Sequence, residues 1–181
     1  MTFESRRSKQ THYLARLFKA YMKNDANLIE VKIGALIMDP NTNTPIVVLK
    51  GVDSETVLPI WVGAFEANAI ALEIEKVVPQ RPMTHDLLRN VIIECRLSAA
   101  SVVITDLTEN TFYARIELTD QNDEPVSLDA RPSDAIALAL RLDCPIYVER
   151  KVIDLSASSA SSEDPTGEKV APPDDWPELI S

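Results

Sequence analysis

The chain has 181 residues, of which 45% are hydrophobic and 25% are charged, and its formal net charge is −10. These values are typical of one globular domain with extensions. The sequence contains no apolar run of roughly 18 residues or more, so we expect no membrane span. Proteins that hold nucleic acid by its phosphates normally present a basic face, so any nucleic-acid role of this acidic chain must depend on a local patch.

The two ends of the chain differ in charge from the middle. Residues 1–24 carry six basic residues and one acidic residue, and five of their apolar residues follow helical spacing: Tyr13, Leu14, Leu17, Phe18 and Tyr21. We interpret residues 1–27 as a basic amphipathic extension that packs on the domain, on another subunit or on a membrane surface. Residues 155–181 carry six acids and one lysine among many Ser and Pro residues, so they are predicted to form a disordered acidic tail.

Neither the N-terminus nor the cysteines indicate an exported protein. The first residues include basic side chains but no apolar segment before a cleavage site. Cys95 and Cys144 fall inside apolar patterns and lack metal-ligand spacing. We therefore expect core thiols and a cytoplasmic location.

Residues 28–154 read as one continuous domain whose elements can be followed in chain order. Apolar alternation and turn residues predict seven strands, with turns at 39–44 and 108–110, and these strands cover residues 28–39, 45–51, 58–62, 100–107, 111–119, 125–130 and 145–153. Helical spacing predicts three helices, at 64–78, from Thr84 onward, and at 134–142. Strands in runs with helices grouped between them predict an α+β fold with a compact, mixed, largely antiparallel sheet and about three packed helices.

The same patterns predict which residues form the core. Helix 134–142 is small or apolar all round, so it should be deeply buried. The helix that starts near Thr84 should bury one apolar face, formed by Leu87, Leu88, Val91, Ile92 and Cys95. Trp61 and Tyr147 are expected to be core aromatics.

Two helix starts share an Arg-Pro motif. One is QRPMTHDLLRN from Gln80, and the other is RPSDAIALALR from Arg131. Proline suits the first helical turn, Thr84 and Ser133 are good N-caps, and Asp86 and Asp134 complement the helix dipole. This structural interpretation explains every motif residue except the two arginines and His85.

The unexplained residues are those that could carry chemistry. Arg81 or Arg131 beside open helix N–H groups could bind an anion such as phosphate, unless each arginine simply pairs with an acid and locks its own turn. An imidazole suits proton transfer, so His85 is the natural general acid or base, although a histidine at a helix start can also be purely structural. Asp86, Asp134 and Glu66 could hold a hard divalent cation, although capping or solvation also accounts for each acid. We expect residues 80–86 and 131–134 to converge in space, because two helices packed side by side with the same polarity would bring their starts together.

Three blocks, LPIWVGAFEANAIAL, RPMTHDLL and LDARPSDAIALALRLDCPIYV, together resemble the bifunctional nuclease family. The resemblance covers roughly residues 29 to 154, with all three blocks in order. It implies cleavage of both DNA and RNA without strong sequence preference, and oligomers that are commonly dimers. The family's motif positions fall on Glu66, Arg81, Thr84, His85, Asp86, Arg131, Ser133 and Asp134.

Two functional hypotheses follow. In the first, the chain is a nuclease assisted by Mg²⁺ or Mn²⁺. Its roles divide into catalytic residues (His85, Asp86, Asp134), phosphate-binding residues (Arg81, Arg131, Thr84, Ser133) and metal ligands (Glu66, Asp86, Asp134). In the second, it is a non-catalytic regulatory or anion-binding module that acts as an oligomer.

Overall fold

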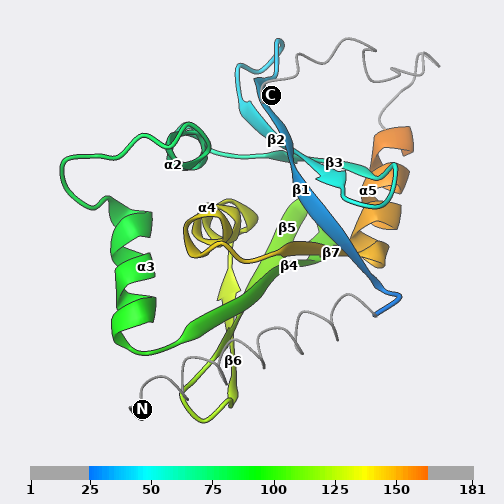
Figure 1. Cartoon of the computed structure of the whole chain (residues 1–181). Coiled ribbons are helices and arrows are strands. Elements are labelled where there is room, and N and C mark those ends of the chain that lie inside the picture. The colour runs from blue at the N-terminus through cyan, green and yellow to red at the C-terminus, as the bar shows by residue number, and fades with distance from the viewer. Residues whose placement is uncertain (1–24, 163–181) are drawn as a thin grey trace, which may run out of the picture.

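A computed structural model describes residues 25–162 as a seven-stranded sheet with four helices (Figure 1). The strand order is β3-β2-β1-β7-β4-β5-β6, and only the β4–β7 pair is parallel. The strands are β1 (Leu28–Met38), β2 (Pro45–Gly51), β3 (Val57–Trp61), β4 (Ser98–Thr108), β5 (Thr111–Thr119), β6 (Pro125–Ala130) and β7 (Ile146–Glu149). The helices are α2 (Ala64–Ile74), α3 (Thr84–Glu94), α4 (Pro132–Leu142) and α5 (Arg150–Ser162). The predicted α+β fold with a largely antiparallel sheet is confirmed.

Tight turns join the predicted strand pairs because their residues accept unusual backbone conformations. Glu109 and Asn110 join β4 to β5 with φ values of 49° and 58°. Two successive residues with positive φ form the turn whose twist matches that of an antiparallel hairpin. Between β1 and β2, the Asp39 carboxylate accepts a 2.9 Å hydrogen bond from the Asn41 backbone N–H.

Helix α4 is the centre of the fold. It contacts β4 and β5 of the sheet as well as α2 and α3. Ala135, Ile136 and Ala137 have no exposed surface. Small alanines allow the neighbouring helices to approach closely, and the deep burial predicted for this helix is confirmed.

The C-terminal part of the domain differs from the prediction. Strand β7 ends at Glu149, and the chain then forms α5, which packs on β4 and β7. The final strand predicted to run to residue 153 is therefore wrong in its second half. The expected boundary at residue 155 falls inside α5, so the first residues assigned to the acidic tail are helical. The rest of that tail and the N-terminal amphipathic segment lie outside the described residues.

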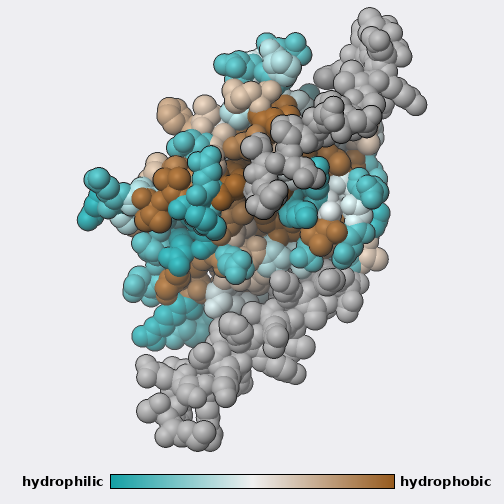
Figure 2. All heavy atoms as spheres, turned by 45° about the horizontal axis from the view of Figure 1, so that its top comes forward, coloured by the Kyte–Doolittle hydropathy of each residue, from teal (hydrophilic) through white to brown (hydrophobic). Residues whose placement is uncertain are grey.

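Burial of α3 was predicted incorrectly. Within this helix only Ile92 is buried, while Leu87 is 59% exposed and Leu88 and Val91 are nearly half exposed. Cys95 and Trp61, both expected in the core, are exposed as well, whereas Tyr147 is buried as predicted. Figure 2 shows brown apolar patches that reach the surface between hydrophilic ones on one face of the molecule.

The helix caps also differ from the prediction. Met83 is the N-cap of α3 and Arg131 is the N-cap of α4, so Thr84 and Ser133 lie inside the first turns. Proline suits the first helical position because it has no N–H to be capped, and α4 accordingly starts at Pro132, two residues earlier than a Ser133 cap would place it. None of the helices in the described part of the chain is long and apolar enough to cross a membrane.

Candidate functional site

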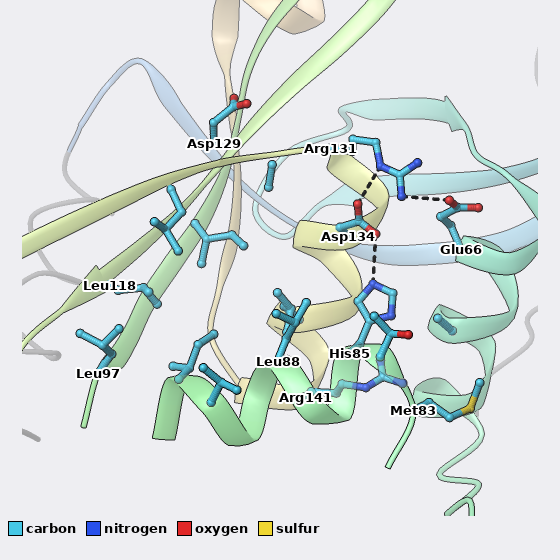
Figure 3. A pocket seen from close by; sticks show the side chains of 18 of the residues that line it. Glu66, Met83, His85, Leu88, Leu97, Leu118, Asp129, Arg131, Asp134 and Arg141 are labelled. Carbon is cyan, nitrogen blue, oxygen red and sulfur yellow. Dashed lines mark hydrogen bonds and ion pairs between the residues drawn. The ribbon is translucent and has the colours of Figure 1, made fainter. Parts of the chain in front are cut away.

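The starts of α2 and α4 meet. Figure 3 shows both helices beginning at the same end, with Glu66 and Arg131 facing each other. The Arg131 guanidinium donates to a Glu66 carboxylate oxygen at 2.9 Å and, through Nε, to Asp134 Oδ2 at 2.7 Å. One arginine therefore bridges two carboxylates that come from different helices.

Helix α3 brings a histidine to the same place. His85 Nε2 lies 3.1 Å from Asp134 Oδ1, and the His85 side chain is only 12% exposed. The result is a chain of contacts in the order Glu66, Arg131, Asp134, His85, which we call the helix-start cluster (Figure 3). Segments 49 residues apart in the sequence are thus joined by one hydrogen bond.

A second ion pair fixes the first turn of α3. Asp86 Oδ1 accepts from Arg141 Nε at 2.7 Å, and Asp86 Oδ2 accepts from the Met83 backbone N–H at 2.9 Å. Arg141 is 4% exposed and also donates to the Ala137 carbonyl at 2.9 Å. The hydrogen bond from Arg141, together with that from Met83, outweighs desolvation and lowers the pKa of Asp86. Asp86 is therefore ionised and positions the start of α3.

The expected meeting of the two motifs is confirmed for His85 and Asp134, but the helices do not run side by side. Figure 1 shows α3 from the side and α4 nearly end-on. The first turn of α3 contacts both Asp134, at the start of α4, and Arg141, seven residues later and roughly 10 Å along the axis. The pair that begins together with the same direction is α2 and α4.

The electrostatics of the cluster favour charged side chains. Burial acts to raise the pKa of Asp134, but the hydrogen bonds from Arg131 and His85 outweigh it and lower that pKa. Asp134 and then Glu66 raise the pKa of Arg131. Both partners of the Arg131–Asp134 pair thus keep their charges over the neutral pH range.

The remaining candidate residues lie at different distances from this cluster. Thr84 is exposed and lines the same pocket, whereas Ser133 is buried. Arg81 is exposed, does not line the pocket and makes no side-chain hydrogen bond or ion pair within residues 25–162. The structure brings Glu66, His85, Arg131 and Asp134 together but leaves Arg81 outside the group.

The cluster opens into a pocket of about 800 Å³. Strands β5 and β6 and helices α2, α3 and α4 form its walls, and most of the lining side chains are apolar. Figure 3 shows Leu88, Leu97 and Leu118 on one side of His85 and Met83 on the other. The charged groups therefore lie beside an apolar groove rather than on a basic surface.

Arg141 and the apolar lining of the groove were not predicted from the sequence. Arg141 ends the helix that carries Asp134, but its partner Asp86 lies 55 residues away in the sequence. The helical spacing of apolar residues indicated that α3 has an apolar face, but it could not show which neighbouring element covers that face. A basic residue in the last turn of a buried helix was the only available signal for Arg141.

In their present positions, the carboxylates near the cluster do not form a binding site for a divalent cation. Within the described part of the chain, no three His, Cys, Asp or Glu side chains are grouped as metal ligands. Glu66 and Asp134 are held by the Arg131 guanidinium, which lies where an ion between the two carboxylates would bind. Asp86 is turned to Arg141 instead. These acids could ligate an ion only after the arginines moved away.

Comparison with known proteins shows the family of this chain. Residues 47–161 match the description "Bifunctional nuclease domain". An uncharacterized protein of Mycobacterium tuberculosis is 44% identical over 124 residues, which cover 68% of this chain and 73% of that protein. "Bifunctional nuclease 1" and "Bifunctional nuclease 2" of Oryza sativa subsp. japonica are 27% and 32% identical over 140 and 111 residues. These matches cover 75% and 60% of this chain, but only 42% and 34% of the rice proteins. The chain belongs to the bifunctional nuclease domain family.

Proposed function

We propose that the chain is a nuclease that hydrolyses phosphodiester bonds of DNA and RNA with little sequence preference. The observation that carries this proposal is the contact of His85 with Asp134, 3.1 Å apart, at the edge of an open pocket. Asp134 is held in turn by Arg131, so a potential proton-transfer group, its orienting acid and a cation occupy one place. Because the chain belongs to the bifunctional nuclease domain family, nucleic acid is the substrate class proposed for this chemistry.

His85 would act as the general base. When Nε2 donates its proton to Asp134, Nδ1 is the unprotonated nitrogen and can accept a proton from an attacking water molecule. Asp134 would fix the ring orientation and stabilise the imidazolium that forms. The protonated ring could then return the proton to the oxygen that leaves phosphorus.

Arg131 would bind the phosphate that is attacked. Its side chain is 66% exposed, and its contacts with Glu66 and Asp134 use only two of its five N–H donors. A guanidinium with free donors can meet phosphate oxygens and stabilise charge that develops on them. Thr84, at the pocket wall, could add a hydroxyl contact. Arg81 and Ser133 remain proposed phosphate-binding residues, although neither of them lines this pocket.

Assistance by Mg²⁺ or Mn²⁺ remains part of the proposal, with Glu66, Asp86 and Asp134 as the ligands expected from the sequence. A divalent ion would supply charge stabilisation at the phosphate. No step above depends on it, because the described carboxylates are held by Arg131 and Arg141. Activity with and without added metal decides this point.

The test is cleavage of supercoiled plasmid and of RNA by purified protein, with Mg²⁺, with Mn²⁺ and with EDTA. Wild type should cleave both substrates, and His85→Ala should lose about 10²- to 10⁴-fold in rate, as expected for a general acid or base. Val78→Ala is the matched control, because Val78 is 88% exposed and lies outside the pocket. Equal activity of wild type and His85→Ala would trace the cleavage to a contaminating nuclease.

A second candidate function is a non-catalytic regulatory or anion-binding module. One observation favours it, namely the net charge of −10, because an acidic protein binds a polyanionic nucleic acid weakly. A thermal-shift screen with phosphate-bearing metabolites separates the two functions. Stabilisation by such a compound without any cleavage would favour the module, whereas cleavage without stabilisation would favour the nuclease.

We also propose that the chain acts in the cytoplasm as a homodimer or a higher homo-oligomer. Apolar side chains such as Leu87 and Ile93 on α3 are available for a subunit contact, because they are exposed and do not line the pocket. Burial of exposed apolar area is the main driving force of such contacts. Sedimentation of wild type and of Leu87→Asp tests this, and a monomer in both cases would contradict it.

A further inference from the structure

The groove beside the helix-start cluster exposes an aromatic ring. Phe65, in the first turn of α2, is 90% exposed and lines the groove next to Glu66. Four other apolar side chains of the lining are more than 40% exposed, namely Met83, Leu88, Val91 and Leu128. An uncovered group of this kind, continuous with charged residues, is typical of a binding site rather than of scattered surface residues.

The charges of the groove limit how it could hold a polyanion. Its lining contains three acids, Glu66, Asp129 and Asp134, and two arginines. Of these arginines, Arg141 is 4% exposed and bound to Asp86, so Arg131 is the accessible one. The whole chain carries a net charge of −10. Binding that follows the phosphates of a duplex requires several basic contacts, and this surface offers about one.

Affinity for nucleic acid must therefore come from the bases. In a duplex the bases are paired and stacked inside, so they cannot reach an apolar groove. Unpaired bases can turn outward and stack on an aromatic ring, a contact worth about tenfold or more in affinity per base. Phe65 offers such a ring without rearrangement, because almost its whole side chain is already exposed.

The position of the cluster agrees with this mode of binding. His85 lies between Met83 on one side and Leu88, Leu97 and Leu118 on the other (Figure 3). A strand whose phosphate contacts Arg131 and His85 would thus have apolar surface on either side of that phosphate. Helix α3, which forms one wall, is roughly 16 Å long, so the groove spans more than one nucleotide step.

We propose that the groove selects single-stranded nucleic acid and that Phe65 is a stacking platform for an unpaired base. The inference rests on the proposed nuclease function and names its substrate class. Phe65 contacts the base and not the reacting atoms, so its replacement should weaken binding and raise KM while leaving kcat nearly unchanged.

The experiment measures fluorescence anisotropy of a labelled 12-nucleotide single strand and of the matching duplex. It uses the His85→Ala background with EDTA present, which prevents cleavage during the titration. The single strand should bind at least tenfold more tightly than the duplex. Phe65→Ala should weaken single-strand binding about tenfold, equivalent to ~1.4 kcal/mol, whereas Phe65→Tyr should retain it. Val78→Ala, which removes an exposed side chain outside this groove, should change nothing.

Two outcomes would overturn the inference. They are equal affinity for duplex and single strand, and unchanged binding by Phe65→Ala. If unchanged binding came with a change in the sedimentation mass of Phe65→Ala, this face would be a contact between protein subunits. Failure of the proposed function has a different signature, because wild type would then bind the single strand through Phe65 without cleaving it. Cleavage that is insensitive to Phe65→Ala would instead retain the function and remove the platform.

Discussion

Helices α3 and α4 begin with similar motifs, but α4 is buried and α3 is largely exposed. Each carries an aspartate at the third helical position, Asp86 in α3 and Asp134 in α4. Asp134 contacts the arginine of its own motif and reaches out to His85, whereas Asp86 pairs with Arg141 from the other helix. Helix α4 is buried on all sides, and α3 leaves most of its apolar face uncovered. One motif therefore holds the cluster in place, and the other brings the histidine to it from the margin of the fold.

This difference shows how a buried helix can support chemistry on an exposed one. Arg141 contacts the Ala137 carbonyl in its own helix and Asp86 in the next, so the end of α4 fixes the start of α3. His85 is the residue next to Asp86 in this turn, so the same contact also fixes the backbone that carries His85. The precise placement of His85 thus depends on two ion pairs, one at each end of α4, and each can be removed separately.

Removing the two aspartates separately should give the largest contrast. Asp134→Asn leaves the side-chain shape but loses the charge that orients His85 and stabilises its protonated form, so kcat should fall on the order of 10²-fold or more. Asp86→Asn should lower kcat less, because Asp86 contacts Arg141 and acts on His85 only indirectly, through the position of the first turn of α3. The measurement is the initial rate of RNA cleavage at saturating substrate. Equal losses of kcat in the two variants would contradict the division of roles.

Truncations in the two helices should differ strongly in stability. Ile136→Ala in α4 removes a side chain with no exposed surface and should lower the unfolding free energy by about 2–5 kcal/mol. Leu87→Ala in α3 removes a side chain that is more than half exposed in the single chain, so its cost to the unfolding free energy of a monomer should stay within about 0.5 kcal/mol. Urea unfolding of both variants provides the comparison. A large loss for Leu87→Ala would show that another subunit or segment covers α3 in solution.

The Asp86–Arg141 pair should give a characteristic pH dependence. The pKa of Asp86 is lowered from 3.8 in the folded state, so its contribution to stability is full above that value and is lost as pH falls through the folded pKa. Asp86→Asn should therefore cost about 1.5–2 kcal/mol at pH 7, the lower end for a hydrogen bond to a charged group, and progressively less below roughly pH 4. Asp134 also has a lowered pKa, but it is present in both proteins and cancels in the difference. A difference that is constant from pH 7 to pH 3 would contradict this account.

The parts of the fold that could be predicted from the sequence are those set by local patterns. Strand alternation and turn residues gave the hairpin of β4 and β5, and an all-round apolar sequence gave the burial of α4. The meeting of His85 with Asp134 was also predicted, although through the wrong helix packing. Periodicity could not show that α3 lacks a covering layer, because the pattern of a buried face and of a binding face is the same. The pairing of Arg141 with Asp86 depends on tertiary structure alone.

The smallest effect we expect concerns the start of α3 itself. Residue preferences make Thr84 the better N-cap, but the structure has Met83 there and gives Thr84 no capping hydrogen bond. The Met83 N–H is satisfied by Asp86 instead, at 2.9 Å. Thr84→Ala should therefore change the unfolding free energy by less than about 0.5 kcal/mol, whereas loss of a true threonine cap costs about 0.5–2 kcal/mol. Thermal and urea unfolding of Thr84→Ala, with Asp86→Asn as the comparison, measure this directly. A loss above about 1 kcal/mol would mean that the helix begins at Thr84 in solution, which would also turn His85 relative to Asp134.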